Sequence, residues 1–325
     1  MEIPHILCTK IESSNKEIQL LNESITDFSP TTPSQEDFFA DLCFFKSFDE
    51  LEQEAFPKDA YYLFALHKFY KKEALLSNRL PHLIEEIECK QNRAKDFTSW
   101  ASFCRDLGLC SFIAEAAGQY KLADSLACKM IKETELFNNK FFDCNKNNYP
   151  LGVLLPLAFN LAPIHRRIFL ANELNNQILS LIAENKFSLS ARETSLTLKA
   201  LCQFGFTSTA YSLFSSSVNK ISPFSLLGFI TSTVLGISWQ DSSPGFSHIV
   251  LCPNFIKEFE SLKIKFKSPY GKIEISCSLV GDGFLYCFEI PRSATVILPS
   301  GKSYSFPSGN HKIKIPFLCQ NDVNT

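Results

Sequence analysis

Residues 236–253 read GISWQDSSPGFSHIVLCP, and this stretch joins two different sequence patterns. It begins at the end of a long apolar run with helical character. It then passes through a cluster of turn-forming residues, Asp241 to Gly245, and leaves as FSHIVLCP, an extended run with β-branched residues. The stretch therefore predicts that the chain changes from helices to strands at this point.

Downstream of this stretch, apolar residues alternate with polar ones, as in strands that bury one face. The clearest case is KIEISCSL, and breaks with Gly and Pro, such as SPYG and VGDG, separate it from its neighbours. Short alternating strands with such turns predict an antiparallel β-sandwich over residues 239–325. The expected strands are residues 262–266, 272–279, 284–290, 294–298, 302–306 and 311–315.

Upstream, residues 58–238 show helical periodicity interrupted by short links. Ser190 and Glu193 have the spacing of a capping box, and Gly205 is expected to end the helix that follows them. Short links between antiparallel neighbours make helical hairpins, so a stacked solenoid and a closed α/α-toroid both fit. No fixed repeat period is present, which counts against the solenoid. The expected helices begin at Asp59, Pro81, Leu109, Tyr120, Pro163, Ser190, Thr207 and Pro223.

Residues 1–57 are the least regular part of the chain. They contain SPTTPSQED, which is loop-like, and the aromatic cluster FFADLCFF at residues 38–45. We expect an irregular, Phe-rich N-terminal segment that packs against a larger body.

Composition indicates a folded protein with more than one domain. The chain has 325 residues, 45% of them hydrophobic and 20% charged, which suffices for sizeable cores. Its formal net charge of −2 gives no electrostatic reason to expect nucleic acid or an anionic membrane as a partner.

The 12 cysteines include no CxxC pair, and most lie among apolar neighbours. This usage is typical of buried thiols in a reducing compartment, so we expect a cytoplasmic protein without disulfides or zinc. The N-terminal residues MEIPHILCTK have no basic region of a secretory signal. The uncharged run at residues 221–239 contains Ser, Thr, Pro and Gly, and we expect a buried helix there rather than a membrane span.

The junction at residues 236–253 resembles that of the bacterial α-L-rhamnosidase family of glycoside hydrolases, in which the last helix of an α/α-toroid leads into a C-terminal β-sandwich. SPYGKIEIS at residues 268–276 is similar to a strand segment of that sandwich, and residues 290–313 resemble its closing hairpins. Residues 121–143 and 196–214 are similar to toroid helices of the family. The resemblance implies an α+β multidomain fold, with a partial α/α-toroid of the six-hairpin type followed by the antiparallel β-sandwich.

The resemblance also implies the inverting hydrolysis of terminal rhamnose, which needs two carboxyls about 6.5–9.5 Å apart. One carboxyl is held protonated as the acid and the other stays ionised as the base. The family's acidic loop with Arg and Trp has no counterpart here, and the Gly-Ala-Thr-Thr…Trp-Glu segment that bears the base is absent. Phe229 stands where the family usually has a carboxylate, and an apolar ring cannot transfer a proton. We therefore assign no catalytic residue.

Asp96 and Trp100, in KDFTSWASF, are the candidate substrate-binding residues. The family often has Gly-Asp-Trp before the corresponding helix, and the resemblance implies that Trp100 stacks on a sugar. The alternative is that Trp100 is a half-buried packing residue. No motif for a cofactor or a metal is present, and none is expected.

Three functional hypotheses remain. The first is a degenerate, non-catalytic relative of the α-L-rhamnosidases, which binds carbohydrate weakly, acts as a partner subunit or is a surviving fragment without an enzymatic role. The second is an active glycoside hydrolase with relocated carboxylates, for which Glu115, Asp96 and Glu193 are the candidates. The third is a helical scaffold for protein contacts. A shortened toroid exposes apolar helix edges, so we expect residues 38–56, a protein partner or a second subunit to cover the gap.

Overall fold

The computed structural model describes residues 11–24, 60–71, 73–141, 152–184, 189–218, 223–239 and 243–316. Contacts divide these residues into two units. The helical unit ends at Leu213, and the sheet unit contains residues 11–24 and the chain from Phe214 onward. The sequence had suggested a boundary at residue 238, so the last helical turns before the strands group with the sheets instead.

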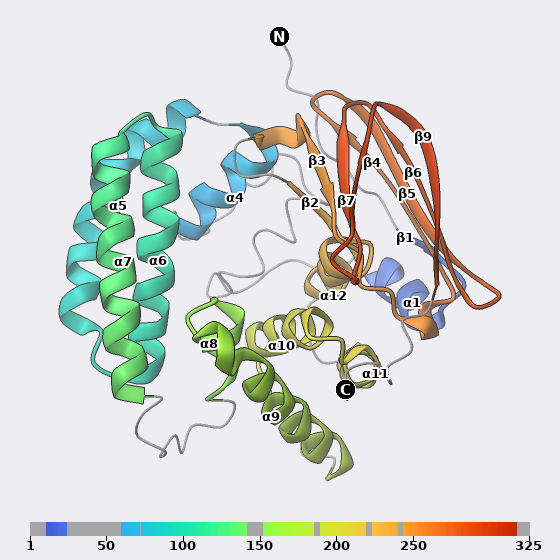
Figure 1. The fold of residues 1–325 in the computed structure, drawn as a ribbon, viewed down its shortest axis with the longest axis horizontal. Helices are drawn as coiled ribbons and strands as arrows, with labels where there is room; N and C mark the ends of the chain where they lie inside the picture. Colours follow the sequence, from blue (N-terminus) through green and yellow to red (C-terminus); the bar gives the residue numbers. More distant parts are fainter. Residues whose placement is uncertain are drawn as a thin grey trace. The chain divides into compact units, whose positions relative to one another are not determined.

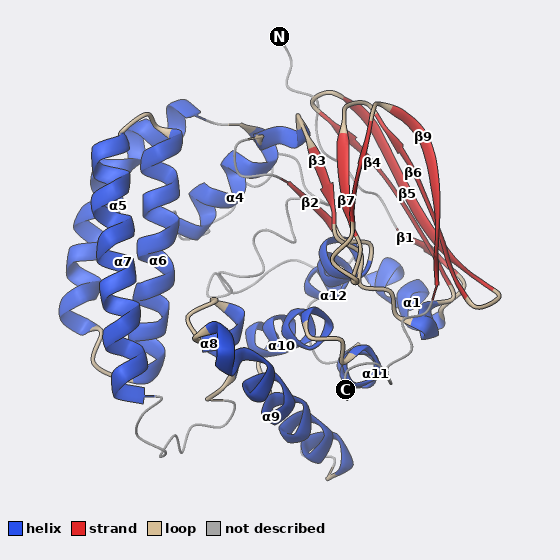
Figure 2. Cartoon of the chain, in the orientation of Figure 1, coloured by secondary structure: helices blue, strands red, loops and turns tan. Residues whose placement is uncertain are grey.

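The helical unit is built from hairpins (Figures 1 and 2). α6 and α7 form the most extensive pair, and α5 lies against α6. Gly118, with φ +75°, ends α6 and allows the tight turn into α7. Gly108 lets the two helices approach, because a Cβ there would lie 2.9 Å from the sulfur of Met130. The helices of this unit are α4 (Ala60–Tyr70), α5 (Glu73–Arg93), α6 (Phe97–Ala116), α7 (Tyr120–Phe141), α8 (Leu154–Ala158), α9 (Ile164–Ala183), α10 (Ala191–Gln203) and the first part of α11 (Thr207–Ser217).

Two predicted helix starts are wrong. Pro81 lies inside α5 and does not open a helix, because the buried stripe of Leu76, Leu80, Leu83 and Ile87 continues across it. Burial of this stripe offsets the backbone hydrogen bond that proline cannot make. α6 begins at Phe97 rather than at Leu109. The capping box at Ser190 is confirmed, and α10 ends just before Gly205, whose φ of +84° suits a glycine that follows a helix C-cap.

The sheet unit contains a five-stranded sheet in the order β1-β4-β5-β6-β9 and a four-stranded sheet in the order β2-β3-β7-β8. The first is antiparallel throughout, as predicted, whereas β3 and β7 pair in parallel in the second. The strands are β1 (Ile11–Ser13), β2 (Ile237–Trp239), β3 (Ile249–Leu251), β4 (Ser261–Ser268), β5 (Gly271–Val280), β6 (Gly283–Ile290), β7 (Ala294–Ile297), β8 (Ser303–Phe306) and β9 (Gly309–Pro316). The helices are α1 (Lys16–Ser24), α12 (Pro223–Phe229), a π-helical turn (Ile230–Val234) and two 3₁₀ turns (Pro244–Phe246 and Lys257–Phe259).

The N-terminal segment contributes to this unit. Ile11 of β1 pairs with Ile264 of β4, and α1 follows directly. A three-residue strand is too short to show an alternating pattern, which is why the sequence predicted only irregular structure there. The rest of the predicted segment, including the Phe-rich residues 38–56, lies outside the described residues.

The junction at residues 236–253 is fixed by close backbone contacts. Gly236 has φ +72°, and a Cβ on it would overlap the backbone of Cys252 and Pro253. The Cys252 amide donates to the Gly236 carbonyl at 2.7 Å. The hydroxyl of Tyr286, a fully buried residue of β6, donates to the Leu235 carbonyl at 2.7 Å. These contacts tie the end of the π-helical turn to both sheets.

Candidate functional site

Asp96 caps α6. Its carboxylate accepts hydrogen bonds from the Ser99 amide at 2.9 Å and from the Ser99 hydroxyl at 2.7 Å. These hydrogen bonds lower the pKa of Asp96, because they favour its ionised form. The residue therefore has the position and the partners of a helix cap.

Trp100 lies one turn further along α6 and is half-buried. Its indole nitrogen donates to the Glu133 carboxylate at 3.1 Å. The ring lies edge-to-face with Phe137 and Phe141, and the Lys140 amine sits 5.0 Å from its centre. Neighbouring side chains thus pack around the indole ring, as expected for a packing residue.

Of the relocated carboxylates proposed from the sequence, Glu115 lies too far along α6 to pair with Asp96, and Glu193 serves as part of a helix cap. Glu115 is exposed in the last turn of that helix. At 1.5 Å per residue, it lies roughly 28 Å along the axis from Asp96, far beyond the spacing that inverting hydrolysis needs. Glu193 of α10 accepts from the Ser190 amide at 2.8 Å and from its hydroxyl at 2.7 Å, within the capping box.

A buried ionic cluster on α5 and α6 was not predicted. The side chain of Asp106 is only 5% exposed, and its two oxygens accept from Lys90 at 2.8 Å and from Arg105 at 3.1 Å. Burial alone would lower the pKa of Lys90, but the charges and hydrogen bonds of Asp106 and Glu86 raise it above its ordinary value. An acidic residue within the apolar run of α6 was the only signal for this cluster in the sequence.

A second group of polar side chains on α4 is also buried. Lys68 is fully buried, with its amine 4.3 Å from the centre of the Phe112 ring and 5.3 Å from that of Phe64. His67 is 3% exposed, and desolvation lowers the pKa of its ring, which favours the neutral form of the imidazole. Arg105 of α6 also contacts this helix. Its guanidinium carbon lies 5.5 Å from the centre of the Tyr61 ring on α4 and 4.8 Å from the centre of the Phe159 ring.

The chemistry open to these groups is limited. Both carboxylate oxygens of Asp106 are paired with protein side chains, one with Lys90 and one with Arg105. The pair with Lys90 fixes α5 against α6. Within the described ranges, no group of three or more His, Cys, Asp and Glu side chains could hold a metal ion. No helix in those ranges is long and apolar enough to cross a membrane.

Solved structures define the class of fold. The chain is similar to the α-L-rhamnosidase of Streptomyces avermitilis, solved with L-rhamnose, at 15% identity and a TM-score of 0.76, covering 94% of this chain and 42% of that one. The enzyme of Aspergillus terreus gives 15% identity, a TM-score of 0.72 and coverage of 95% and 50%. The enzyme of Dictyoglumus thermophilum gives 14% identity and a TM-score of 0.74, with coverage of 96% of this chain and 50% of that one. The fold is thus an α+β multidomain fold shared with these glycoside hydrolases.

The family assignment comes from the C-terminal part. Residues 236–312 match the family model of the bacterial α-L-rhamnosidase C-terminal domain, which confirms the resemblance seen in the sequence. The chain is a relative of the α-L-rhamnosidases through this part. It spans about half the length of the α-L-rhamnosidases that it matches. A search of curated proteins found no match.

Proposed function

We propose that this chain is a non-catalytic relative of the α-L-rhamnosidases that binds carbohydrate. The loss of catalysis is supported by the structural roles of two candidate carboxylates, Asp96 and Glu193. Asp96 caps α6 and Glu193 completes the capping box of α10, so both serve the fold locally. A general acid must instead be held protonated, and the hydrogen bonds to Asp96 act in the opposite direction.

Phe229 supports the same proposal. The resemblance places it where the family usually has a carboxylate. Its ring is fully buried at the end of α12 and packs 6.2 Å from that of Phe214. The position therefore belongs to the apolar core of the sheet unit and cannot exchange a proton with a substrate.

Carbohydrate binding rests on the family relationship. The relative from Streptomyces avermitilis was solved as a complex with L-rhamnose. We extend a carbohydrate ligand to this chain as part of the proposal, without a catalytic step. We also place the protein in the cytoplasm, because Cys104, Cys110, Cys202 and Cys277 are buried free thiols.

The test is the hydrolysis of a chromogenic α-L-rhamnoside by the folded chain, beside its Asp96→Asn and Glu193→Gln variants. We expect no turnover above buffer from any of them. Circular dichroism confirms that each variant is folded, and calorimetric titration with L-rhamnose measures binding separately. Turnover by the unmodified chain that one substitution abolishes would show a relocated catalytic carboxylate and refute the proposal.

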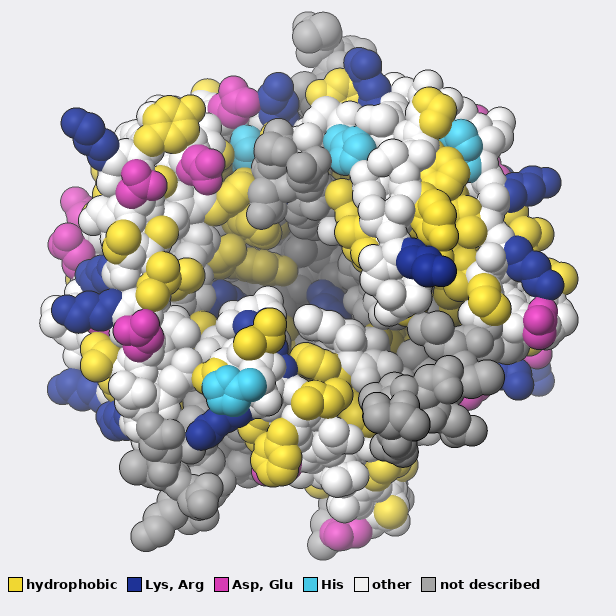
Figure 3. Space-filling view, viewed as in Figure 1, with side chains coloured by type: hydrophobic (Ala, Val, Ile, Leu, Met, Phe, Trp, Pro, Cys, Tyr) yellow, Lys and Arg dark blue, Asp and Glu magenta, His cyan; other side chains and the backbone are white. Residues whose placement is uncertain are grey.

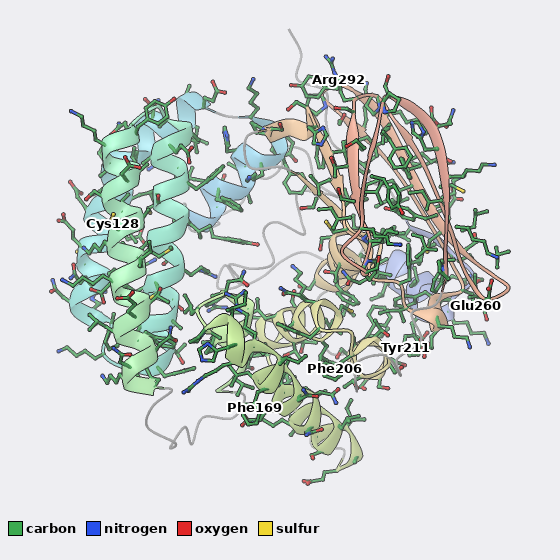
Figure 4. All side chains as sticks on the ribbon, viewed as in Figure 1. Cys128, Phe169, Phe206, Tyr211, Glu260 and Arg292 are labelled. Carbon is green, nitrogen blue, oxygen red and sulfur yellow. The ribbon has the colours of Figure 1, made fainter. Side chains whose placement is uncertain are left out.

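A scaffold for protein contacts is the second candidate, and the surface of α9 favours it. Ile164 is 82% exposed and Phe169 is 69% exposed, and Ile168 and Leu179 are exposed on the same helix. Figure 4 labels Phe169 on α9. Large apolar side chains gathered along one exposed helix are typical of contact surfaces.

A further inference from the structure

The outer face of the five-stranded sheet is rich in lysine. Strand alternation and register bring to this one face six lysines and three glutamates of β1, β4, β5, β6 and β9. Asp282 of the turn between β5 and β6 pairs with Lys314 at 3.0 Å, so the excess is two positive charges. The whole chain, in contrast, has a net charge of −2. Figure 3, which colours Lys and Arg alike, shows such side chains projecting from the sheet unit. The residues are Lys263, Lys265, Lys267, Lys272, Lys312 and Lys314, with Glu12, Glu274 and Glu289.

Ion pairs neutralise only part of this face. Glu274 contacts both Lys263 and Lys272 at 2.6 Å, and Lys272 also contacts Glu289 at 3.2 Å. In the part of the chain that the structure describes, no ion pair forms to Lys267 or Lys312, and both are exposed. The uncompensated charge is therefore concentrated on the two strands that flank β5 and β6.

One pairing on this face works against stability. Lys267 of β4 stands directly opposite Lys272 of β5, and like charges at directly opposed positions are destabilising. The acidic side chains nearby pair with Lys272 and leave Lys267 without a partner in the described residues. An anionic ligand lying across β4 and β5 would relieve this repulsion.

The side chains between the lysines suit a carbohydrate. Ser276 and Ser278 of β5 and Asn310 of β9 lie on the same face by register, and Ser276 and Ser278 are half-buried. The half-buried Leu285 and Cys287 of β6 lie between these serines and the lysines of β9, and they add a small apolar area to the face. Hydroxyl and amide groups form hydrogen bonds with sugar hydroxyls, while the flanking ammonium groups attract carboxylates. The face is a sheet surface whose neighbouring strands lie about 4.8 Å apart, so it offers repeated donors to an extended chain.

We propose that this face binds an acidic polysaccharide, a polymer of sugar carboxylates, lying across β4, β5, β6 and β9. The inference rests on the proposed function, since it names the class of carbohydrate that the chain binds. Duplex nucleic acid is the less favoured anion, because its binding relies on neutralising many phosphates and only Lys267 and Lys312 on this face have no ion pair among the described residues.

The test is the binding of polygalacturonate to the full chain, measured by calorimetry at low and at physiological salt. We expect binding that weakens as salt is added. The double variant Lys267→Glu/Lys312→Glu is expected to bind at least about tenfold more weakly. The matched control, Lys121→Glu/Lys132→Glu on α7, makes the same change in net charge at exposed positions of the helical unit and is expected to bind like the unmodified chain.

The outcomes separate this inference from the proposed function. Equal weakening in the control pair, equal affinity for duplex DNA, or no binding of polygalacturonate would each overturn the inference. L-rhamnose binding without polygalacturonate binding would leave the proposed function intact. Rhamnoside hydrolysis together with Lys267-dependent binding of polygalacturonate would refute the non-catalytic proposal and support the inference.

Discussion

Gly236 is the residue on which the junction between helix and strand depends most. Its φ of +72° lies in the left-handed region, and the space for a Cβ is filled by the backbone of Cys252 and Pro253. Two separate costs therefore oppose any side chain here. One is the conformational cost of positive φ, and the other is displacement of a neighbouring backbone segment that cannot rotate away.

We expect Gly236→Ala to destabilise the chain by more than about 3 kcal/mol, because both costs add. The measurement is the free energy of unfolding from a denaturant titration. Gly281→Ala is the matched control, since Gly281 has φ +60° in the same unit and nothing within 4 Å of its Cβ position. The control is expected to lose only about 1 kcal/mol. Equal losses in the two variants would contradict the backbone overlap.

At the scale of single elements, the sequence predicted the positions of strands best where one face of the strand is buried and the other is exposed. The alternation of KIEISCSL led directly to β5, because each inward residue enters the core. The helices were harder to delimit. The start of α6 at Phe97 depends on the side chain of Asp96 as a cap, whereas its apolar residues do not favour one starting point. Pro81 led to a wrong helix start, because the burial of the apolar stripe of α5 outweighs the backbone hydrogen bond that proline cannot make.

The carboxylate of Glu274 is expected to make the stability of the sheet depend on pH. Hydrogen bonds from Lys263 and Lys272 lower its pKa from an ordinary 4.5 to about 2. A lowered pKa contributes stability that is present above about pH 4.5 and is lost as pH falls towards 2. Since the side chains of Lys263 and Lys272 are 36% and 53% exposed, solvent screens both ion pairs, and we expect about 1 kcal/mol.

The check is the unfolding free energy of Glu274→Gln at pH 7 and near pH 2. The variant should be less stable than the unmodified chain at pH 7 and should converge with it near pH 2. Glu12→Gln is the control on the same face, because Glu12 lies 3.7 Å from Lys265 in a more open contact. A constant difference between Glu274→Gln and the unmodified chain at both pH values would contradict the assignment.

At the scale of the whole molecule, the class of fold and the family were predictable and the buried polar groups were not. The family could be inferred because its C-terminal motifs are local in sequence, as in SPYG before β5. The ion pair of Lys90 with Asp106 joins residues 16 positions apart on two helices, and neither residue has a local signature. Glu133 as the partner of Trp100 was missed for the same reason. The predicted substrate-binding role of Asp96 and Trp100 stays a prediction.

The scaffold candidate predicts self-association or partner binding through α9. If the chain associates with itself in sedimentation experiments, Phe169→Glu should weaken the association, because it places a charge within the apolar surface. Tyr120→Glu is the control, since Tyr120 is similarly exposed, at 67%, on α7. A chain that stays monomeric at all concentrations, with or without Phe169→Glu, would argue against self-association through this surface.

The pairing of β1 with β4 has a consequence for how the protein is made. Ile11 meets Ile264, so the two strands leave the ribosome about 250 residues apart. At roughly 5–20 residues per second, the first strand waits on the order of ten seconds or more for its partner. The helical unit is translated in that interval, while Ile11 has no strand of the sheet to join. The edge of the five-stranded sheet is therefore completed late in synthesis, and a chaperone that holds the nascent N-terminus would act before this step.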